Sequence, residues 1–590
     1  MASAVASLSL LATSCGDDFL DKTPKGNYTA DNFYASDAAV RKGVEPLYNK
    51  AWFNFNRRAL IGMGSYRAND GWNPYVSAEF ANFKVTALTE DLGLAWSALY
   101  NVVTMSNGIL ANLENNCTPA VSESVKNSAM GECHLMRGWA YFYLLRGWGA
   151  NILFESNEDI VKVPIKPLNT EADVLKFIIR DFRKAVELLP TASTDHHATR
   201  YTAKAALAKA LLAQSGWDES ATADHSRNEQ TLQEVVTLCD EVINCGQFDL
   251  LPNYEDLFKA QNNDNVETIL AMRWADPNTN EWGAMNATYS DLAFPEVSDV
   301  NVWGGNLSVS CDMLDIYNED PADSIRRKAT WFSPGSYYDY IKKADGGYTY
   351  NHNWMQCKKG VLGTKADVAP CNIAQMASPL NTYIQRLADV YLMKAEAILG
   401  NNASTSDAAA IAAFEKVHNR ARIVPVSYSS ITLDDIIRER RIEFCMEYFN
   451  WWDMVTWYRW KPKTMLEFFN YKQHRAFEIR ENSLYKRDNG TFSYRVIPPG
   501  TGTWYLFDEN GHLFWNDYLA ESENDNTAVR LDEPYVYNLN ELLAKYCDGF
   551  QKVELSETNI FMPYPESDVI QNKYFNEAPV SYDFTWDVED

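Results

Sequence analysis

Residues 432–460 read TLDDIIRERRIEFCMEYFNWWDMVTWYRW, a stretch in which charged residues give way to a dense run of aromatic residues. Thr432 and Asp435 have the spacing of a capping box, with Asp in the place of Glu, which predicts that a helix begins there. Helical spacing puts three acids on one face, within reach of two arginines: Glu439, Glu443, Glu447, Arg440 and Arg441. The stretch therefore predicts a helix that carries many charged groups in a tryptophan-rich setting.

Two interpretations of these acids are open. Glycoside hydrolases use pairs of carboxylates, so a catalytic role is one of them. The chain contains 79 acidic residues, however, and pairs at suitable spacing arise by chance. Arginines and glutamates so close together on a tryptophan-rich helix favour a fixed, partly buried ion network. We interpret the acids as structural and keep catalysis as the alternative.

Pairs of amphipathic segments with interleaved Ala and Gly recur along the chain. Residues 129–149 are followed by 171–189, 202–217 by 231–245, and 386–400 by 407–422, while 96–113 supplies a further helix of the same kind. Small residues allow two helices to approach closely, so the pairs predict hairpins similar to tetratricopeptide repeats. Unrelated helices in an ordinary bundle are the alternative. We expect a mainly α body whose helical scaffold lies mainly in 86–250 and 383–460.

The segments between these helices have a different composition. Residues 261–381 are rich in Trp, Tyr, Asn, Asp, Gly and Pro, with little helical periodicity, and 461–541 are similar. Long irregular segments of this kind are usually functional. Together with 51–85, they predict a large loop-rich face with short strands that contacts a ligand.

The N-terminal segment LLATSCGDDFL, residues 10–20, has a lone cysteine between an apolar run and two acids. Residues 1–14 are apolar or small, like the hydrophobic region of a secretory signal. A cysteine directly after such a run is similar to a bacterial lipobox, in which the thiol is acylated. We expect residues 1–14 to be a signal peptide, Cys15 to carry lipid, and 15–27 to be a tether. An inert cysteine in a disordered tail is the alternative.

Composition excludes several classes of function. The formal net charge is −26 without a Lys/Arg-rich block, so nucleic acid would be repelled. No run of about 18 apolar residues is present. The 10 cysteines show no metal-binding spacing, the His196-His197 pair favours a solvated loop, and the common hydrolase, zinc-protease and phosphate-loop motifs are missing. We expect no metal, no cofactor and no nucleic-acid partner.

Several stretches together resemble the SusD/RagB family. The Glu-Arg-Arg run and the aromatic end of residues 432–460 look like that family's signature helix. In chain order, four further stretches match: CGDDFLDKTP (15–24), ECHLMRGWAYFYLLRGWGANILF (132–154), YIQRLADVYLMKAEAILG (383–400) and NIFMPYPESDVIQN (559–572). The resemblance covers essentially the whole chain, so we expect residues 28–590 to form a single SusD-like body.

The resemblance also implies a function. Members of the family are outer-membrane lipoproteins that bind oligosaccharides, sometimes peptides, at the cell surface. They sit as a lid on a SusC-type TonB-dependent transporter and are not enzymes. The acids Asp17 and Asp18 resemble the signal that sends such lipoproteins to the cell surface. A glycan-binding lipoprotein of an uptake system is the leading prediction. A peptide binder, a glycan hydrolase and a scaffold for protein partners are the alternatives.

A sugar site requires flat aromatic side chains together with amides, carboxylates or arginines. The segment SYRANDGWNPY supplies this mixture, and its Gly71 and Pro74 predict an exposed turn. From this segment and from later ones, we predict as ligand-binding residues Arg67, Asn69, Asp70, Trp72, Asn73, Tyr75, Trp282, Tyr289, Trp303, Trp331 and Arg386. Asp70 and Trp72 are the first choices, because family members place early-chain loops of this kind beside the sugar. Arg386 has the alternative of bracing the helix packing, and Trp96, at helical spacing with Leu99 and Val103, is expected in the core.

Overall fold

The computed structural model describes residues 33–473 except positions 74, 280, 321, 334 and 353–354. It also describes strand segments at 484–486, 492–496, 505–507 and 513–514, and residues 555–584. The predicted signal peptide, lipid-bearing cysteine and tether lie outside these ranges, as does most of the predicted loop region 461–541.

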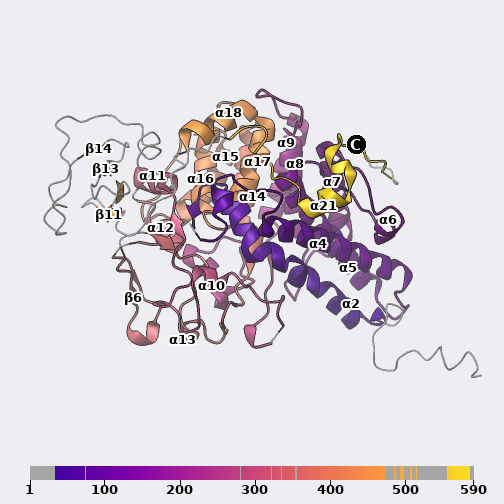
Figure 1. Cartoon of the computed structure of the whole chain (residues 1–590), viewed down its shortest axis with the longest axis horizontal. Coiled ribbons are helices and arrows are strands. Elements are labelled where there is room, and N and C mark those ends of the chain that lie inside the picture. Colours follow the sequence, from indigo (N-terminus) through magenta and orange to yellow (C-terminus); the bar gives the residue numbers. More distant parts are fainter. Residues whose placement is uncertain are drawn as a thin grey trace, which may run out of the picture.

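The protein is mainly α-helical (Figure 1). The longer helices are α2 (Asp37–Val44), α4 (Glu90–Asn115), α5 (Glu123–Trp148), α7 (Glu171–Leu188), α8 (Arg200–Gln214), α9 (Glu229–Ile243), α11 (Cys311–Glu319), α14 (Leu387–Leu399), α15 (Ala408–His418), α16 (Leu433–Glu443) and α17 (Asn450–Trp460). Shorter helices are α3 (Ala78–Ala81), α6 (Asn157–Lys162), α10 (Tyr289–Leu292), α12 (Ser324–Thr330), α13 (Lys365–Val368), α18 (Pro462–Glu467) and α21 (Glu566–Gln571).

The predicted helix pairs are present and form one continuous series. Helix α4 packs on α5, α5 on α7, α7 on α8, α8 on α9, α9 on α14 and α14 on α15. Small residues allow the close approach: a Cβ atom added at Gly138 of α5 would lie 2.5 Å from the ring of Phe182 on α7. The tetratricopeptide-like arrangement is therefore confirmed, and it forms the upper and right-hand part of the molecule in Figure 1.

Short antiparallel strands hold the irregular segments together. One sheet has the order β1 (Gly71–Trp72), β3 (Ser308–Val309), β7 (Gln356–Cys357), β4 (Trp331–Phe332). The two-stranded sheets pair β2 (Thr268–Met272) with β8 (Thr382–Arg386), β5 (Tyr337–Tyr338) with β6 (Tyr348–Thr349), and β9 (Ser404–Thr405) with β10 (Ile431–Thr432). A further sheet contains β11 (Leu484–Lys486), β12 (Phe492–Val496), β13 (Tyr505–Phe507) and β14 (Leu513–Phe514).

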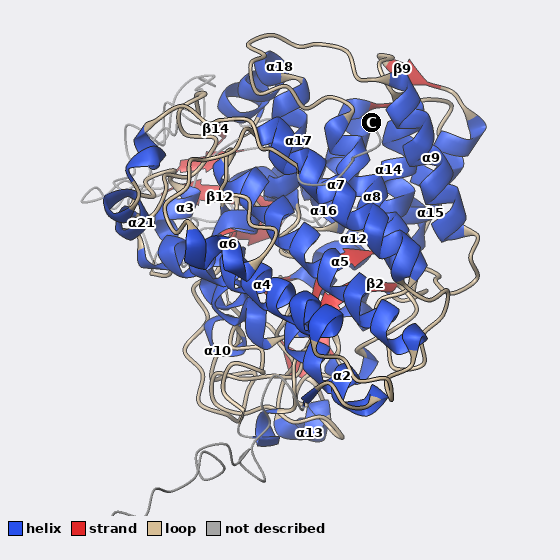
Figure 2. Cartoon of the chain, turned by 90° about the vertical axis from the view of Figure 1, so that its right-hand side faces the viewer, coloured by secondary structure: helices blue, strands red, loops and turns tan. Residues whose placement is uncertain are grey.

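The first of these sheets joins segments that are far apart in the sequence. Gly71 pairs with Val309, and Trp331 with Cys357, so the early segment 51–85 lies beside the segment 261–381. The loops that carry α10 and α13 lie at the lower side of both views, opposite α18 (Figures 1 and 2). The fold thus separates a helical side from a loop-rich side.

The C-terminal segment 555–584 packs back onto the first helices. The backbone N–H of Met562 donates to the Gly147 carbonyl at 2.8 Å, and the indole N–H of Trp148 donates to Pro563 at 3.0 Å. Trp96 is buried, as predicted, and its indole N–H reaches Asp568 at 3.1 Å. The C-terminal segment is therefore fastened to helices α4 and α5. No helix among the residues described in the structure is both long and apolar enough to cross a membrane.

The signature stretch forms two helices with a break between them. Helix α16 begins with the predicted capping box, in which Thr432 and Asp435 exchange hydrogen bonds. It ends at Glu443, and the chain then turns through Met446 and Tyr448, which both have positive φ. Gly64 lies against this turn, where an added Cβ atom would come within 2.3 Å of the Tyr448 carbonyl oxygen.

The acids of the signature stretch form the buried ion network that the sequence predicted. Arg386 contacts Glu443 at 2.6 Å, Glu447 at 2.8 Å and Glu267 at 2.7 Å, and all four side chains are buried. Burial opposes the charge on Glu443, but arginines around it outweigh burial and hold the pKa of Glu443 well below its usual range. The partners differ from the expectation, because Glu443 pairs with arginines outside its own helix and Arg440 pairs with Asp389 and Asp453.

Candidate functional site

The first-choice segment around Asp70 is not the exposed turn that the sequence predicted. Arg67, Asn69, Asp70, Trp72 and Asn73 are all buried. The reason is long-range packing: the π-helical turn Gly62–Tyr66 and strand β1 insert this segment beneath the break between α16 and α17. Gly71 and Pro74 lie close together in the sequence, which indicated a turn. Their spacing could not show that distant segments of the chain cover this turn.

The polar groups of this segment have partners inside the protein. Asp70 accepts hydrogen bonds from Asn450 at 3.0 Å and from the Met446 backbone at 3.3 Å. Burial raises the pKa of Asp70 to about 6, although the nearby Arg441 opposes the shift. Arg67 donates to the carbonyls of residues 559 and 560 at 2.6 and 2.8 Å. These groups hold the signature turn and the C-terminal segment in place.

Three of the later candidates are buried as well. Trp331 is 0% exposed, and Tyr289 donates its hydroxyl to the Gly363 carbonyl at 2.8 Å. Arg386 is the centre of the ion network described above, so its alternative role in bracing the helices is the one that the geometry supports. Because burial leaves no ring face or guanidinium edge of these three residues open to a ligand, they do not belong to the candidate site.

The remaining candidates are exposed aromatic side chains. Tyr75 is 72% exposed, Trp282 55% and Trp303 42%. We call these three residues the aromatic platform. Exposed aromatic rings offer flat apolar faces on which a ligand can stack.

Each platform residue is held by a neighbour. The indole N–H of Trp303 donates to Asp291 at 2.8 Å, and the backbone N–H of Trp303 donates to Ser290 at 3.1 Å. The ring of Trp282 packs edge-on against Phe53, with 5.2 Å between centroids. The backbone N–H of Tyr75 donates to the Asn73 side chain at 2.9 Å. These contacts orient the rings of Trp282 and Trp303 and fix the backbone of Tyr75, while all three side chains stay exposed.

A small recess lies beside the supports of Tyr75 and Trp303. Its lining contains Asn73 and Val76 from beside Tyr75, Asp291 from beside Trp303, and Arg57, one helical turn after the Phe53 that contacts Trp282. The supports of Tyr75 and Trp303, which are more than 200 positions apart in the sequence, therefore meet at one depression.

Arg57 is a candidate that sequence reasoning missed. It is half-buried at the recess, and its Nε has no hydrogen-bond partner among the described residues. An arginine held in this way can donate hydrogen bonds to ligand hydroxyls. The only signal in the sequence was its position inside the predicted ligand-face segment 51–85, which did not single it out.

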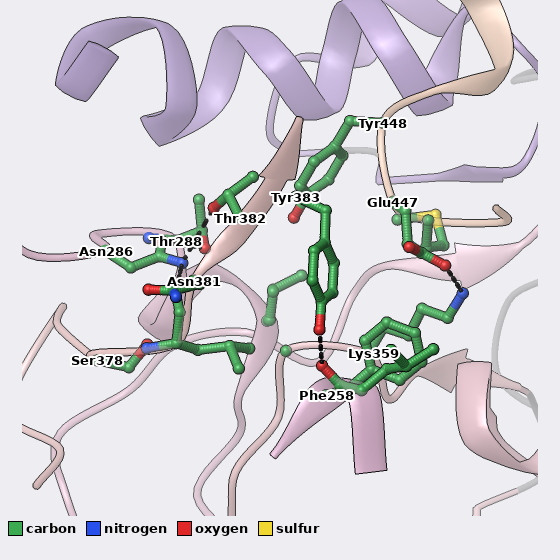
Figure 3. Close-up of a pocket in the computed structure, with 15 residues that line it drawn as sticks. Phe258, Asn286, Thr288, Lys359, Ser378, Asn381, Thr382, Tyr383, Glu447 and Tyr448 are labelled. Carbon is green, nitrogen blue, oxygen red and sulfur yellow. Dashed lines mark hydrogen bonds and ion pairs between the residues drawn. The ribbon is translucent and has the colours of Figure 1, made fainter. Parts of the chain in front are cut away.

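A second cavity, lined mainly by buried residues, adjoins the recess (Figure 3). Its volume is about 40 Å³, enough for one or a few water molecules, and Thr288 and Leu292 line both cavities. Helix α10 therefore forms the wall between them. On the far side, Lys359 contacts Glu447 at 2.8 Å, which connects this cavity to the signature ion network (Figure 3).

Buried amide groups fix the recess from behind. Asn56, next to Arg57, donates to Asn286 at 3.1 Å and accepts from Thr382 at 2.8 Å. Asn286 also donates to the Leu380 carbonyl at 2.8 Å (Figure 3 shows Asn286 and Thr382 side by side). The turn that carries Arg57 is thereby tied to the segment that leads into α10. The site is preorganised, because both walls of the recess share one hydrogen-bond network.

Comparisons with known proteins agree over nearly the whole chain. The family model described as the SusD family matches residues 266–579, and one described as starch-binding associating with outer membrane matches residues 18–212. A SusD-like protein of Bacteroides ovatus is 45% identical over 582 residues, which cover 98% of both chains.

Solved structures give the same result. A crystal structure determined with a xylogluco-oligosaccharide is 42% identical, with a TM-score of 0.78 over 93% of this chain and 100% of that one. A laminarin-binding SusD-like protein, 21% identical with a TM-score of 0.57 over 78% of this chain and 96% of its own, shares the fold. Family models, a full-length relative and the architecture coincide, and the chain therefore belongs to the SusD family.

Proposed function

We propose that this chain binds an oligosaccharide of the xylogluco type on the aromatic platform formed by Tyr75, Trp282 and Trp303. A sugar ring has an apolar C–H face that stacks on a flat aromatic ring, and hydroxyl edges that need polar partners. The single observation that carries the proposal is that Tyr75 and Trp303, two of the three exposed aromatic residues, are held by the recess residues Asn73 and Asp291. The relative determined with a xylogluco-oligosaccharide supports the choice of sugar.

The protein acts as a binder and not as a hydrolase under this proposal. A glycosidase needs two carboxyl groups that flank the bond to be cleaved. The clustered acids of the signature stretch are instead engaged by buried arginines, and Asp291 at the platform already accepts a hydrogen bond from Trp303. Their engagement supports a structural role for these carboxylates.

Calorimetric titration of the purified protein tests both statements. We expect saturable binding of a xylogluco-oligosaccharide, and weaker or no binding of laminarin- and starch-derived oligosaccharides of the same length. Chromatography of the sugar after long incubation should recover it unchanged. Equal affinity for all three sugars would refute the proposed specificity, and shortened products would restore the hydrolase alternative.

We further propose that the protein is a lipoprotein of the outer membrane, anchored through Cys15, and that it delivers its ligand to a SusC-type TonB-dependent transporter. The match of residues 18–212 to a model described as associating with the outer membrane supports the location. The resemblance of the sequence to the SusD/RagB family supports the transporter as partner.

An exposed apolar surface around α6 and α21 offers a docking area for this partner. Leu88, Val163, Ile165, Ile570 and Val580 are exposed there. Hydrogen bonds hold their segments together: the N–H of residue 566 donates to the carbonyl of 87 at 2.9 Å, and the side chain of 572 donates to the carbonyl of 166 at 2.7 Å. Exposed apolar clusters of this kind typically mark sites of protein interaction.

Substitution of this surface tests the assembly. The double variant Ile165→Asp/Ile570→Asp should lose co-purification with the transporter from outer membranes and keep its affinity for sugar. Ile423→Asp is the matched control, because Ile423 is exposed but lies in the loop after α15. Undiminished recovery of the transporter with the double variant would show that docking occurs elsewhere.

A further inference from the structure

A third cavity lies beside the segments that lead to Trp282 of the aromatic platform. Its volume is about 280 Å³, and it opens between the loop before α8, strand β2 and the 3₁₀ turn Glu45–Tyr48. Its lining includes Ala192, His196, Gln247, Phe248, Thr268 and Arg273. Nothing in the ion network or the platform makes use of this space.

The charged groups at this cavity already have partners. His197 lies between Glu132 at 2.6 Å and Glu45 at 3.1 Å. Arg273 donates to Asp264 at 3.2 Å and to the Asp195 carbonyl at 3.2 Å. Since these charges are balanced within the protein, the cavity has little to offer an ion, and a neutral ligand fits it better.

Two polar atoms at the cavity are buried and lack hydrogen-bond partners among the described residues. They are the hydroxyl oxygen of Thr268 and the Nε of Arg273. A buried polar atom without a partner destabilises the protein by about 1–3 kcal/mol, so most such atoms are paired with protein, water or ligand. A ligand with several hydroxyl groups could accept from Arg273 and either donate to or accept from Thr268.

The remaining lining suits the apolar side of such a ligand. Phe248 is half-buried at the cavity, and the aliphatic residues Val266, Ile269 and Leu270 lie beside it. Pockets for small ligands typically measure about 300–1,000 Å³. At about 280 Å³ the cavity lies at the lower end of this range, which suits about one sugar ring and not a chain of several. We infer that it is a second carbohydrate site, which takes one neutral sugar unit.

The second site adjoins the platform. The N–H of Arg273 donates to the Tyr48 carbonyl at 2.6 Å, and Lys50 pairs with Glu281 at 3.0 Å. Residue 53 then contacts residue 282 through their rings, so the segments 48–53 and 273–282 run together from the cavity to the platform. The sugar unit has two sources: a free monosaccharide, or a terminal or branch unit of the oligosaccharide on the platform. The second source rests on the proposed function.

Two variants separate this site from the platform. Thr268→Val keeps the shape and the β-branched side chain but removes the unpaired hydroxyl, so the fold should be retained. Ala192→Phe places a ring at the exposed rim of the cavity and should block it. Ser106→Ala is the matched control, because the Ser106 hydroxyl is also buried without a partner but does not line this cavity.

Affinities for xylose, glucose and a xylogluco-oligosaccharide should be measured by calorimetry and by saturation-transfer NMR. With one net hydrogen bond worth about 1 kcal/mol, Thr268→Val should weaken binding about fivefold, and Ala192→Phe should abolish it. Ser106→Ala should bind like the unmodified protein. Trp303→Ala should retain any monosaccharide binding, so failure of the platform is distinguishable from failure of this site.

The pattern of losses identifies the source of the sugar. Weaker monosaccharide binding by Thr268→Val, together with its loss in Ala192→Phe, supports a site for free sugar. Loss confined to the oligosaccharide supports a site for one of its units. If Thr268→Val and Ala192→Phe bind all three sugars as the unmodified protein does, the inference is overturned.

Discussion

Replacement of Trp303 by alanine removes one ring of the platform with limited damage to the fold. Trp303 is 42% exposed, so truncation uncovers about 120 of roughly 200 Å² of ring surface, an upper limit of about 3 kcal/mol. Trp331, at 0% exposed, would lose the whole area, about 5 kcal/mol, and leave a cavity as well. Trp303→Ala should therefore fold, whereas Trp331→Ala should be strongly destabilised.

The effect on binding should be of a different kind. Stacking of a planar ring on an aromatic side chain contributes about 1–3 kcal/mol in nucleic-acid complexes, and we take this value as a guide for a sugar. The affinity of Trp303→Ala for a xylogluco-oligosaccharide should therefore fall about 5- to 150-fold. Calorimetric titration gives this affinity, and thermal unfolding of the same sample gives the stability.

Tyr337→Ala is the control for a general effect of exposed aromatic residues. Tyr337 is 49% exposed but belongs to the hairpin of β5 and β6, and its hydroxyl donates to Gly346 at 2.7 Å. Its replacement should leave the affinity for the sugar unchanged. If Trp303→Ala is well folded and binds as tightly as the unmodified protein, the platform is misplaced.

Three further predictions concern the rest of the molecule. Arg386→Met leaves Glu443 and Glu447 without their shared partner and should lower the free energy of unfolding by about 3–5 kcal/mol. Denaturant titration measures this value, and an unchanged free energy would contradict the role of the ion network. Burial opposes the charge on His197, but hydrogen bonds to its carboxylate neighbours outweigh burial and raise its pKa to about 9. The raised pKa adds about 3 kcal/mol to the free energy of unfolding, in full below about pH 6.5, and this contribution is lost as the pH rises through 9. Thermal unfolding measured against pH should show the decline. The variant His197→Gln should show a weaker dependence on pH. Cys15→Ala should release the protein from the membrane fraction, and its retention there would refute the proposed anchor.

Local patterns in the sequence were sufficient to predict the helices and to recognise the family. The capping box of Thr432 and Asp435 and the small residues of α5, such as Gly138, act through neighbours along the chain or on the adjacent helix. Their effects follow from helical periodicity, which a single sequence displays. For the same reason, the clustering of acids and arginines in residues 432–460 correctly indicated a buried ion network.

The tertiary structure alone decided which tryptophans are exposed. Trp303 and Trp331 lie in similar polar, aromatic segments, yet one is 42% exposed and the other is buried in the β1–β3–β7–β4 sheet. The SYRANDGWNPY segment was predicted at the surface, and packing against the turn after α16 buries most of it, whereas Tyr75 at its end stays exposed. Arg57 gained significance only because Asn56 and Asn286 join segments more than 200 residues apart. Exposure of a side chain depends on which distant segments cover it, and no local pattern in a sequence contains that information.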